Sequence, residues 1–176
     1  MWWYVLAIVI GLVAICLVWG YLHLRHSQRV AAEAISNVSL GDIDPLRQEC
    51  ENVFREAFGE SLSLDHYEES TRVLSDRLDN VESLKNAFAK PDFYWYFVLP
   101  TGAFLGELLR VHVEGEWHPS EEGGLELHVP VASEFAVTYP FDKILKHVIM
   151  GDKGDIQAYF MSARQLEQAL EQTNEA

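Results

Sequence analysis

Four side chains that can bind a metal ion occupy alternate positions in one short stretch of the chain. They are His112, Glu114, Glu116 and His118. If the stretch is an extended strand, alternate side chains project from the same face, so all four lie together there. Two imidazoles and two carboxylates are suitable ligands for Zn²⁺ or another divalent ion. The stretch is therefore a candidate site for a metal-dependent enzyme.

Other features of the same stretch oppose a metal site. Gly115 indicates a turn between a helix and a strand, and His112 can belong to the preceding helix. Side chains four or more residues apart on a flat strand also diverge too far to share one ion. We therefore expect a solvated strand face without a metal, and the enzyme remains an alternative hypothesis.

A second candidate is Glu107, a carboxylate among apolar residues in the sequence GAFLGELLR at residues 102–110. Burial would make this carboxylate a candidate acid or base. The simpler interpretation is an ion pair with Arg110, which lies three residues later on the same helix face. We favour the ion pair, since exposed pairs of this kind are common.

The sequence contains none of the strong catalytic motifs. It lacks a P-loop, a dinucleotide-binding glycine pattern, a nucleophile elbow, an HExxH helix and a paired CxxC. The sequence GDKGD at residues 151–155 is explained by a turn between two helices. We therefore predict no catalytic residue and no cofactor, and we expect binding rather than catalysis.

The N-terminal residues are strongly apolar. Residues 1–22 contain no charged side chain, and Arg25 and Arg29 follow directly. A helix of this length spans the hydrocarbon core of a bilayer, about 30 Å thick, and basic residues on the C-terminal side place that side in the cytoplasm. The sequence thus predicts a single-pass inner-membrane protein with its N-terminus outside. We expect a transmembrane helix over residues 1–24 and a juxtamembrane linker over residues 25–43.

Beyond the linker, hydrophobic spacing predicts both helices and strands. Helical spacing occurs over residues 44–58, 63–90, 101–111, 140–150 and 155–171, and strand-like alternation over residues 125–131 and 135–139. Trp117 is expected on a further strand that pairs with the first of these. Helices, a small antiparallel sheet and further helices make an α+β domain. We expect this domain to cover residues 44–172, with a disordered tail at residues 173–176.

Two segments of this domain allow alternative interpretations. The long helical stretch at residues 63–90 could dimerise as a coiled coil, but Thr71 interrupts its short heptad pattern. The favoured interpretation is therefore that the stretch packs onto the domain's own core, as one helix or as two helices broken near Asp79 and Asn80. The aromatic run at residues 93–99 is too short to span a membrane, and it suits a buried strand or a packed helical turn.

Part of this domain is similar to small uncharacterised bacterial domains. The resemblance rests on GAFLGELLR, on Trp117 and the strand pair after it, and on YPFDKILKHVIMGD at residues 139–152. Those domains combine a G-x-x-L-G-E helix, a tryptophan strand and a Pro-Phe pair that opens a lysine-containing helix. The resemblance covers about residues 101–160. It supports the α+β fold and implies no activity, so no functional residue is carried over.

The chain is acidic, with 27 acidic residues, 13 basic ones and a net charge of −14. Such a charge repels phosphate backbones, which argues against nucleic-acid binding. It favours either solubility or a basic protein partner.

These observations lead to one leading hypothesis and two alternatives. The leading hypothesis is a membrane-tethered cytoplasmic protein-interaction module, one form of which is an immunity or accessory protein of a bacterial secretion or toxin system. The first alternative is a metal-dependent enzyme that uses His112, Glu114, Glu116 and His118. The second is a structural membrane protein that associates with itself, and the sequence leaves the oligomeric state open.

Overall fold

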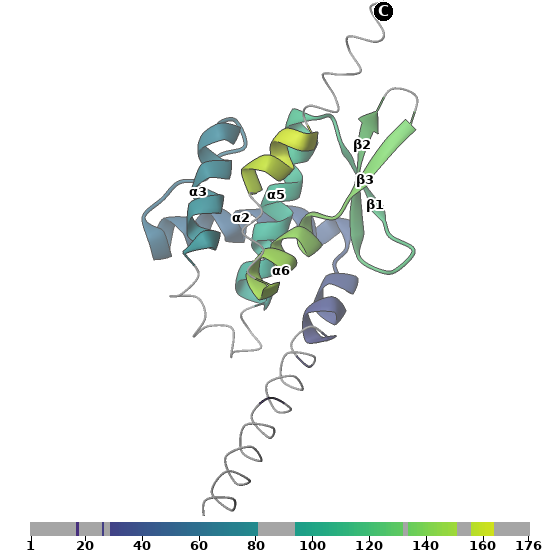
Figure 1. Cartoon of the computed structure of the whole chain (residues 1–176), viewed down its shortest axis with the longest axis horizontal. Coiled ribbons are helices and arrows are strands. Elements are labelled where there is room, and N and C mark those ends of the chain that lie inside the picture. Colours follow the sequence, from purple (N-terminus) through teal and green to yellow (C-terminus); the bar gives the residue numbers. More distant parts are fainter. Residues whose placement is uncertain are drawn as a thin grey trace, which may run out of the picture. The chain divides into compact units, whose positions relative to one another are not determined.

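The computed structural model describes residues 29–80, 94–131, 134–150 and 156–163, together with Leu17 and His26. The chain divides into two compact units, Met1–Glu33 and Ala34–Ala176. In the first unit, residues 29–33 are helical. The second unit holds the helices and strands shown in Figure 1.

The membrane predictions need correction. Over the residues that the structure describes, no helix combines the length and the apolar character that crossing a bilayer requires. This finding overturns the transmembrane part of the predicted fold class, and with it the single-pass inner-membrane localisation. The prediction rested on hydropathy, which measures only composition, and its residues 1–24 lie outside the described residues except for Leu17.

The second unit has a mixed helical and strand composition. Its elements are η1 (Leu40–Asp42), α2 (Ile43–Val53), η2 (Phe54–Phe58), α3 (Tyr67–Asp79), η3 (Tyr94–Val98), α5 (Leu99–His112), β1 (Glu116–Pro119), β2 (Leu125–Val131), β3 (Glu134–Thr138) and α6 (Pro140–Met150). Residues 156–163 form a further helical segment. η1 is a 3-10 turn, whereas η2 and η3 are π-helical turns.

Helix α5 lies at the centre of this α+β unit and is buried from Leu99 to Leu109. It contacts α2, α3, α6 and the strand β2, and Figure 1 shows it between the helices and the sheet. Because neighbours surround it, α5 needs apolar or small residues on every side, and the sequence LPTGAFLGELL supplies them. Glu107 is the only charged residue between Leu99 and Leu109.

The three strands form one antiparallel sheet in the order β1-β2-β3. Trp117 pairs with Leu127, and Val129 pairs with Ala136. The alternate residues Leu125, Leu127 and Val129 of β2 are buried, so this side faces the core. The strand pair predicted from alternation is present as β2 and β3. Trp117 lies on the further strand β1, which pairs with β2 as expected.

The ambiguous segments now have definite assignments. Tyr94–Val98 is a π-helical turn that continues directly into α5. The strand alternative for the aromatic run at residues 93–99 is therefore wrong for residues 94–99. Phe93 lies outside the described residues. Pro100 does not stop the helix, because a proline in the first turn lacks only an N–H that needs no helical partner. The predicted start at Thr101 was therefore too late.

Within the stretch predicted as one helix, or as two helices broken near Asp79 and Asn80, α3 covers Tyr67–Asp79 and ends with Asn80 as its C-cap. Leu74 and Leu78 are fully buried within the chain, which supports the core-packing interpretation over the coiled coil for this part. Residues 81–90 lie outside the described residues. Gly59 ends the preceding helical segment in a left-handed conformation (φ 69°), as its position predicted.

Candidate functional site

The four candidate metal ligands are not brought together. His112 ends α5, where its Nε2 donates to the Leu64 carbonyl oxygen at 2.6 Å. Glu114 is exposed in a left-handed turn (φ 50°), while Glu116 and His118 lie on β1. In the described part of the chain, no three His, Cys, Asp or Glu side chains are grouped so that they could hold a metal ion.

The separation follows from the break between α5 and β1. The Gly115 N–H donates to the Arg110 carbonyl oxygen at 3.2 Å, which closes the end of the helix. A Cβ at Gly115 would lie only 3.3 Å from the His128 backbone oxygen. The turn that Gly115 indicated is thus present, and it divides the four residues between a helix end, a turn and a strand.

Glu107 is buried, contrary to the exposed position that we expected, although its predicted partner is correct. Its carboxylate accepts hydrogen bonds from Arg110 Nε at 2.8 Å and Nη2 at 3.0 Å, and from Trp117 Nε1 at 2.8 Å. The Glu107 carboxylate in turn raises the pKa of Arg110. Three donors hold this carboxylate in place, so its role is to join α5 to β1 rather than to transfer protons.

Two glycines of the G-x-x-L-G-E sequence permit this arrangement. A Cβ at Gly106 would lie 2.1 Å from Cζ2 of Trp117, and one at Gly102 would lie 2.6 Å from Cδ1 of Phe141. The rings of Trp117 and Phe141 also contact each other, with centroids 5.7 Å apart. The motif therefore has a packing explanation, because it lets two aromatic rings approach the backbone of α5 closely.

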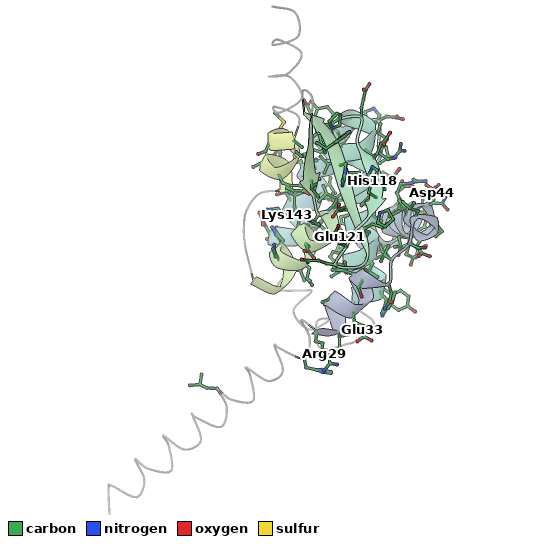
Figure 2. All side chains as sticks on the ribbon, turned by 90° about the vertical axis from the view of Figure 1, so that its right-hand side faces the viewer. Arg29, Glu33, Asp44, His118, Glu121 and Lys143 are labelled. Carbon is green, nitrogen blue, oxygen red and sulfur yellow. The ribbon has the colours of Figure 1, made fainter. Side chains whose placement is uncertain are left out.

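The side of the sheet opposite the core carries the most distinctive surface. We call it the outer face, and it consists of Glu116, His118, Glu126, His128, Pro130, Phe135, Val137 and Tyr139. Phe135 is 64% exposed and Val137 is 45% exposed. Figure 2 is turned toward the sheet side of the molecule and labels His118 and Glu121 there.

A pair of stacked imidazoles lies on the outer face. The rings of His118 and His128 are 4.2 Å apart between centroids, with an interplanar angle of 29°. Nε2 of His128 lies 2.8 Å from Oε1 of Glu126, and Nε2 of His118 lies 3.6 Å from Oε2 of Glu116. The ring of Phe135 lies 5.9 Å from that of His128. Imidazoles, carboxylates and an exposed aromatic ring are thus adjacent.

Hydrogen bonds extend this cluster across all three strands. The His128 hydrogen bond, with further ones from Ser120 and Tyr139, lowers the pKa of Glu126. Partial burial and the nearby Glu126 carboxylate raise the pKa of Tyr139. Glu126 therefore stays ionised and fixes the side chains around it. This cluster was not predicted from the sequence, although the alternation of Glu126 and His128 was a signal that could have revealed it.

Acidic side chains border the outer face. Glu121 and Glu122 are exposed in the turn between β1 and β2, and Glu114 is exposed just before β1. Gly123 and Gly124 complete that turn with φ of 95° and 76°, values that glycine adopts without strain. The outer face thus carries exposed apolar side chains on the edge strand β3 and acidic side chains next to β1.

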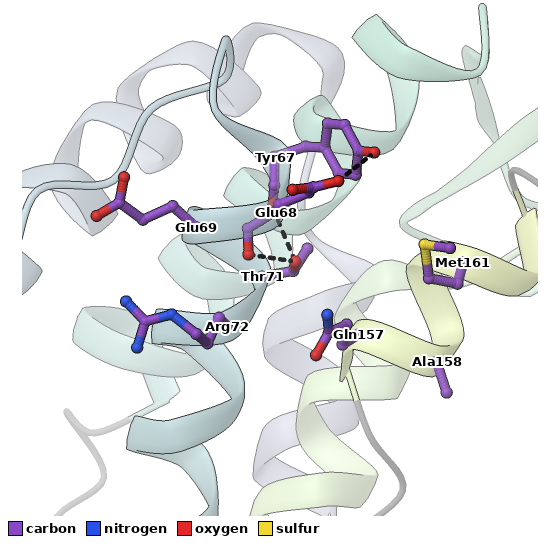
Figure 3. A pocket seen from close by; sticks show the side chains of 8 residues that line it. All are labelled: Tyr67, Glu68, Glu69, Thr71, Arg72, Gln157, Ala158 and Met161. Carbon is purple, nitrogen blue, oxygen red and sulfur yellow. Dashed lines mark hydrogen bonds between the residues drawn. The ribbon is translucent and has the colours of Figure 1, made fainter.

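A pocket of about 770 Å³ lies between α3 and the helical segment 156–163 (Figure 3). Its lining residues are Tyr67, Glu68, Glu69, Thr71, Arg72, Gln157, Ala158 and Met161. Several of its polar groups already have partners: the Tyr67 hydroxyl donates to Glu68 at 3.0 Å, and Arg72 pairs with Asp76 at 3.2 Å. Tyr67, Glu68 and Arg72 are therefore already engaged within the chain.

Two further buried titratable groups were not anticipated. Nε2 of His147 on α6 lies 3.0 Å from Oδ1 of Asp79 at the end of α3, and burial lowers the pKa of His147 despite that carboxylate. The Cys50 thiol is fully buried, which raises its pKa well above the ordinary range. Both groups are buried, which is typical of structural rather than reactive side chains.

Comparisons with known proteins assign no family to this chain. The chain matches no protein-family model, and no curated protein or solved structure is significantly similar to it. We therefore infer function from the geometry of the outer face.

Proposed function

We propose that this chain is a protein-interaction module that binds a basic partner through the outer face of its sheet. The observation that carries the proposal is the row of exposed apolar side chains Phe135, Val137 and Tyr139 beside the stacked His118–His128 pair. Protein interfaces are enriched in aromatic residues at their centre and have a polar border. The outer face likewise places exposed aromatic side chains next to polar and charged ones, with the aromatic side chains along the edge strand β3.

Charge supports the choice of a basic partner. The chain has a net charge of −14, and Glu114, Glu121 and Glu122 are exposed around the outer face. Complementary charge accelerates association and disfavours acidic competitors. The same charge opposes docking of a second copy of this acidic chain, so it argues against self-association.

The placement of the candidate ligands gives the enzyme hypothesis no support. His112, Glu114, Glu116 and His118 do not converge, and three donors occupy the Glu107 carboxylate. An immunity or accessory protein for a basic partner is one specific form of the interaction module. The acidity of the chain is the feature that supports this narrower form.

A crosslinking experiment tests the proposal. A photoreactive amino acid replaces Val137 on the outer face in one variant and Val111 at the end of α5 in another. The two positions are matched, since Val137 is 45% exposed and Val111 is 44% exposed. Both variants are expressed at native level in the source cells, irradiated, and analysed by mass spectrometry of the adducts.

We expect one dominant adduct from position 137, absent from position 111, and formed with a protein whose crosslinked surface is basic. The additional substitution Phe135→Ser should abolish this adduct. Equal adducts at both positions, an acidic partner, or an adduct that survives Phe135→Ser would each refute the proposal.

A further inference from the structure

Strand β3 lies at an edge of the sheet, and among the described residues only β2 pairs with it. An edge strand leaves a row of N–H and C=O groups without partners, and proteins ordinarily protect such edges with lysine, proline, bulges or a covering element. The sequence of β3, EFAVT, contains no lysine or proline, and its register with β2 has no bulge. The opposite edge strand β1 ends in Pro119 and contacts η1. β3 is therefore the less protected edge.

The backbone of β2 shows which residues of β3 face this edge. Alternate residues of a strand direct their N–H and C=O groups to opposite sides. The His128 carbonyl oxygen lies on the β1 side of β2, since a Cβ at Gly115 would lie only 3.3 Å from it. Pro130 directs its backbone to the same side and has no N–H to donate. Leu127 and Val129, in the opposite phase, therefore carry the hydrogen bonds to β3.

Phe135 and Val137 present both their backbone and their side chains for binding. The partners of the two bonded β2 residues are Thr138 and Ala136, so the residues that alternate with these direct their N–H and C=O groups away from β2. No described residue outside β2 forms a backbone hydrogen bond with Phe135 or Val137. Their side chains are exposed on the outer face. Main-chain groups and apolar side chains therefore adjoin at one edge.

We propose that the basic partner binds by adding an extended segment to β3 as a fourth, antiparallel strand of the sheet. This inference rests on the proposed function, because it specifies how the partner binds the same surface. In strand addition, main-chain hydrogen bonds supply affinity and alternate side chains supply specificity. The segment pairs with the backbone of Phe135 and Val137. Its sequence alternates apolar residues, which lie beside those two side chains, with basic residues.

Charges near the end of β3 suit a basic segment. Glu122, Glu126 and Asp142 all lie close enough to act electrostatically on the hydroxyl of Tyr139, which directly follows β3. The basic side chain of Lys143 on α6 lies over an aromatic ring of the helical segment 156–163. A segment with basic residues is therefore attracted to this end of the strand.

A second copy of the chain is the competing occupant of the edge. Two β3 strands could pair with each other, since an edge strand accepts any strand of suitable length. Each copy carries a net charge of −14, however, and the repulsion between two such chains opposes their association. The charge of the chain therefore favours a basic segment over a second copy.

The first measurement needs no partner. Amide hydrogen exchange of the full chain is followed by NMR at several protein concentrations. We expect the amides of Phe135 and Val137 to exchange at least about tenfold faster than those of Ala136 and Thr138, which are bonded to β2. Equal protection of all four amides would overturn the inference, because the edge would already be covered within the chain. Protection of Phe135 and Val137 that grows with concentration would overturn it in favour of a second copy.

The second measurement uses a short fluorescent peptide of alternating arginine and leucine as the probe. Its leucines should lie opposite Phe135 and Val137 and direct their N–H groups at β3. Binding should slow amide exchange at those two residues. N-methylation of the leucines should weaken binding at least about tenfold, a loss of only one or two hydrogen bonds. N-methylation of as many arginines, whose N–H groups point away from β3, should leave the affinity unchanged at the same peptide charge.

The outcomes separate this inference from the proposed function. No binding of the unmodified peptide, equal affinities of the two methylated peptides, or a loss confined to the arginine-methylated one would each overturn strand addition. If Phe135→Ser weakens binding but the two methylated peptides bind equally, side chains alone hold the peptide, and the interaction module stands without strand addition. If the peptide pairs with β3 but crosslinking at position 137 finds no basic partner, the proposed function fails and the inference falls with it.

Discussion

At the scale of single residues, Glu107 illustrates how a charged side chain can serve packing. It is buried on α5, yet each of its oxygens has a donor, because Arg110 reaches it from the same helix and Trp117 from β1. A buried carboxylate without these donors would be costly. The ion pair was predictable from the spacing of the two residues, whereas the tryptophan contact was not, because it depends on how β1 returns to α5.

The Glu107→Ala variant should lower the free energy of unfolding by roughly 2–3 kcal/mol, because it removes charge-assisted hydrogen bonds and leaves the partly buried Trp117 N–H without its acceptor. Chemical denaturation followed by tryptophan fluorescence measures this. The control Glu116→Ala, at a side chain that is 76% exposed, should change stability by less than about 0.5 kcal/mol. Equal losses in the two variants would show that Glu107 does not join α5 to β1.

His147 should make stability depend on pH. Burial lowers its pKa in the folded chain below the ordinary value of 6.5, so the unfolded chain takes up the proton first as the pH falls. The resulting contribution to stability is complete well above pH 6.5. It is lost as the pH falls through 6.5 toward the lower pKa of the folded chain.

Unfolding free energies measured across this range should decline more steeply for the native chain than for a His147→Gln variant. A His66→Gln variant, changed at an exposed histidine, should follow the native curve. If His147→Gln keeps the native slope, other groups cause the decline and the buried His147–Asp79 pair has no part in it.

At the scale of elements, features that depend on neighbouring residues could be predicted from the sequence. Contacts between elements that are distant in the sequence could not. Gly59 as a helix end and the alternation of β2 could be read from neighbouring residues, because caps and strands obey short-range rules. The stacked His118–His128 pair could not, because it depends on the register between β1 and β2. The candidate metal site at His112, Glu114, Glu116 and His118 was wrong for a related reason. The four residues were assumed to lie on one strand, but α5 ends at His112 and β1 begins only at Glu116.

The approach of β1 to α5 gives a direct test at this scale. The Gly106→Ala variant should lower the free energy of unfolding by about 1–3 kcal/mol, because its Cβ would overlap the Trp117 ring. The control Gly41→Ala introduces a Cβ whose nearest neighbour is 3.8 Å away and should be close to neutral. A stable Gly106→Ala variant with unchanged tryptophan fluorescence would contradict the packing explanation of the G-x-x-L-G-E sequence.

At the scale of the whole molecule, composition and surface geometry point to the same kind of partner. The net charge of −14 follows directly from the sequence. It suggested a basic partner but did not indicate which surface of the chain would bind that partner. The fold offers the surface that we propose for it, because the sheet buries one side and leaves Phe135, Val137 and Tyr139 exposed on the other. Hydropathy, by contrast, led to a membrane assignment that the described helices do not support.

The central claim is that the outer face is the binding surface, and one affinity measurement tests it most directly. The partner identified by crosslinking at position 137 is titrated against the native chain, Phe135→Ser and Tyr96→Ser. The two aromatic side chains are matched, since Phe135 is 64% exposed on β3 and Tyr96 is 63% exposed on η3. We expect Phe135→Ser to weaken binding by at least about tenfold, the loss expected for an interface anchor, and Tyr96→Ser to leave the affinity unchanged. Equal affinities for the two variants, or a loss confined to Tyr96→Ser, would contradict it.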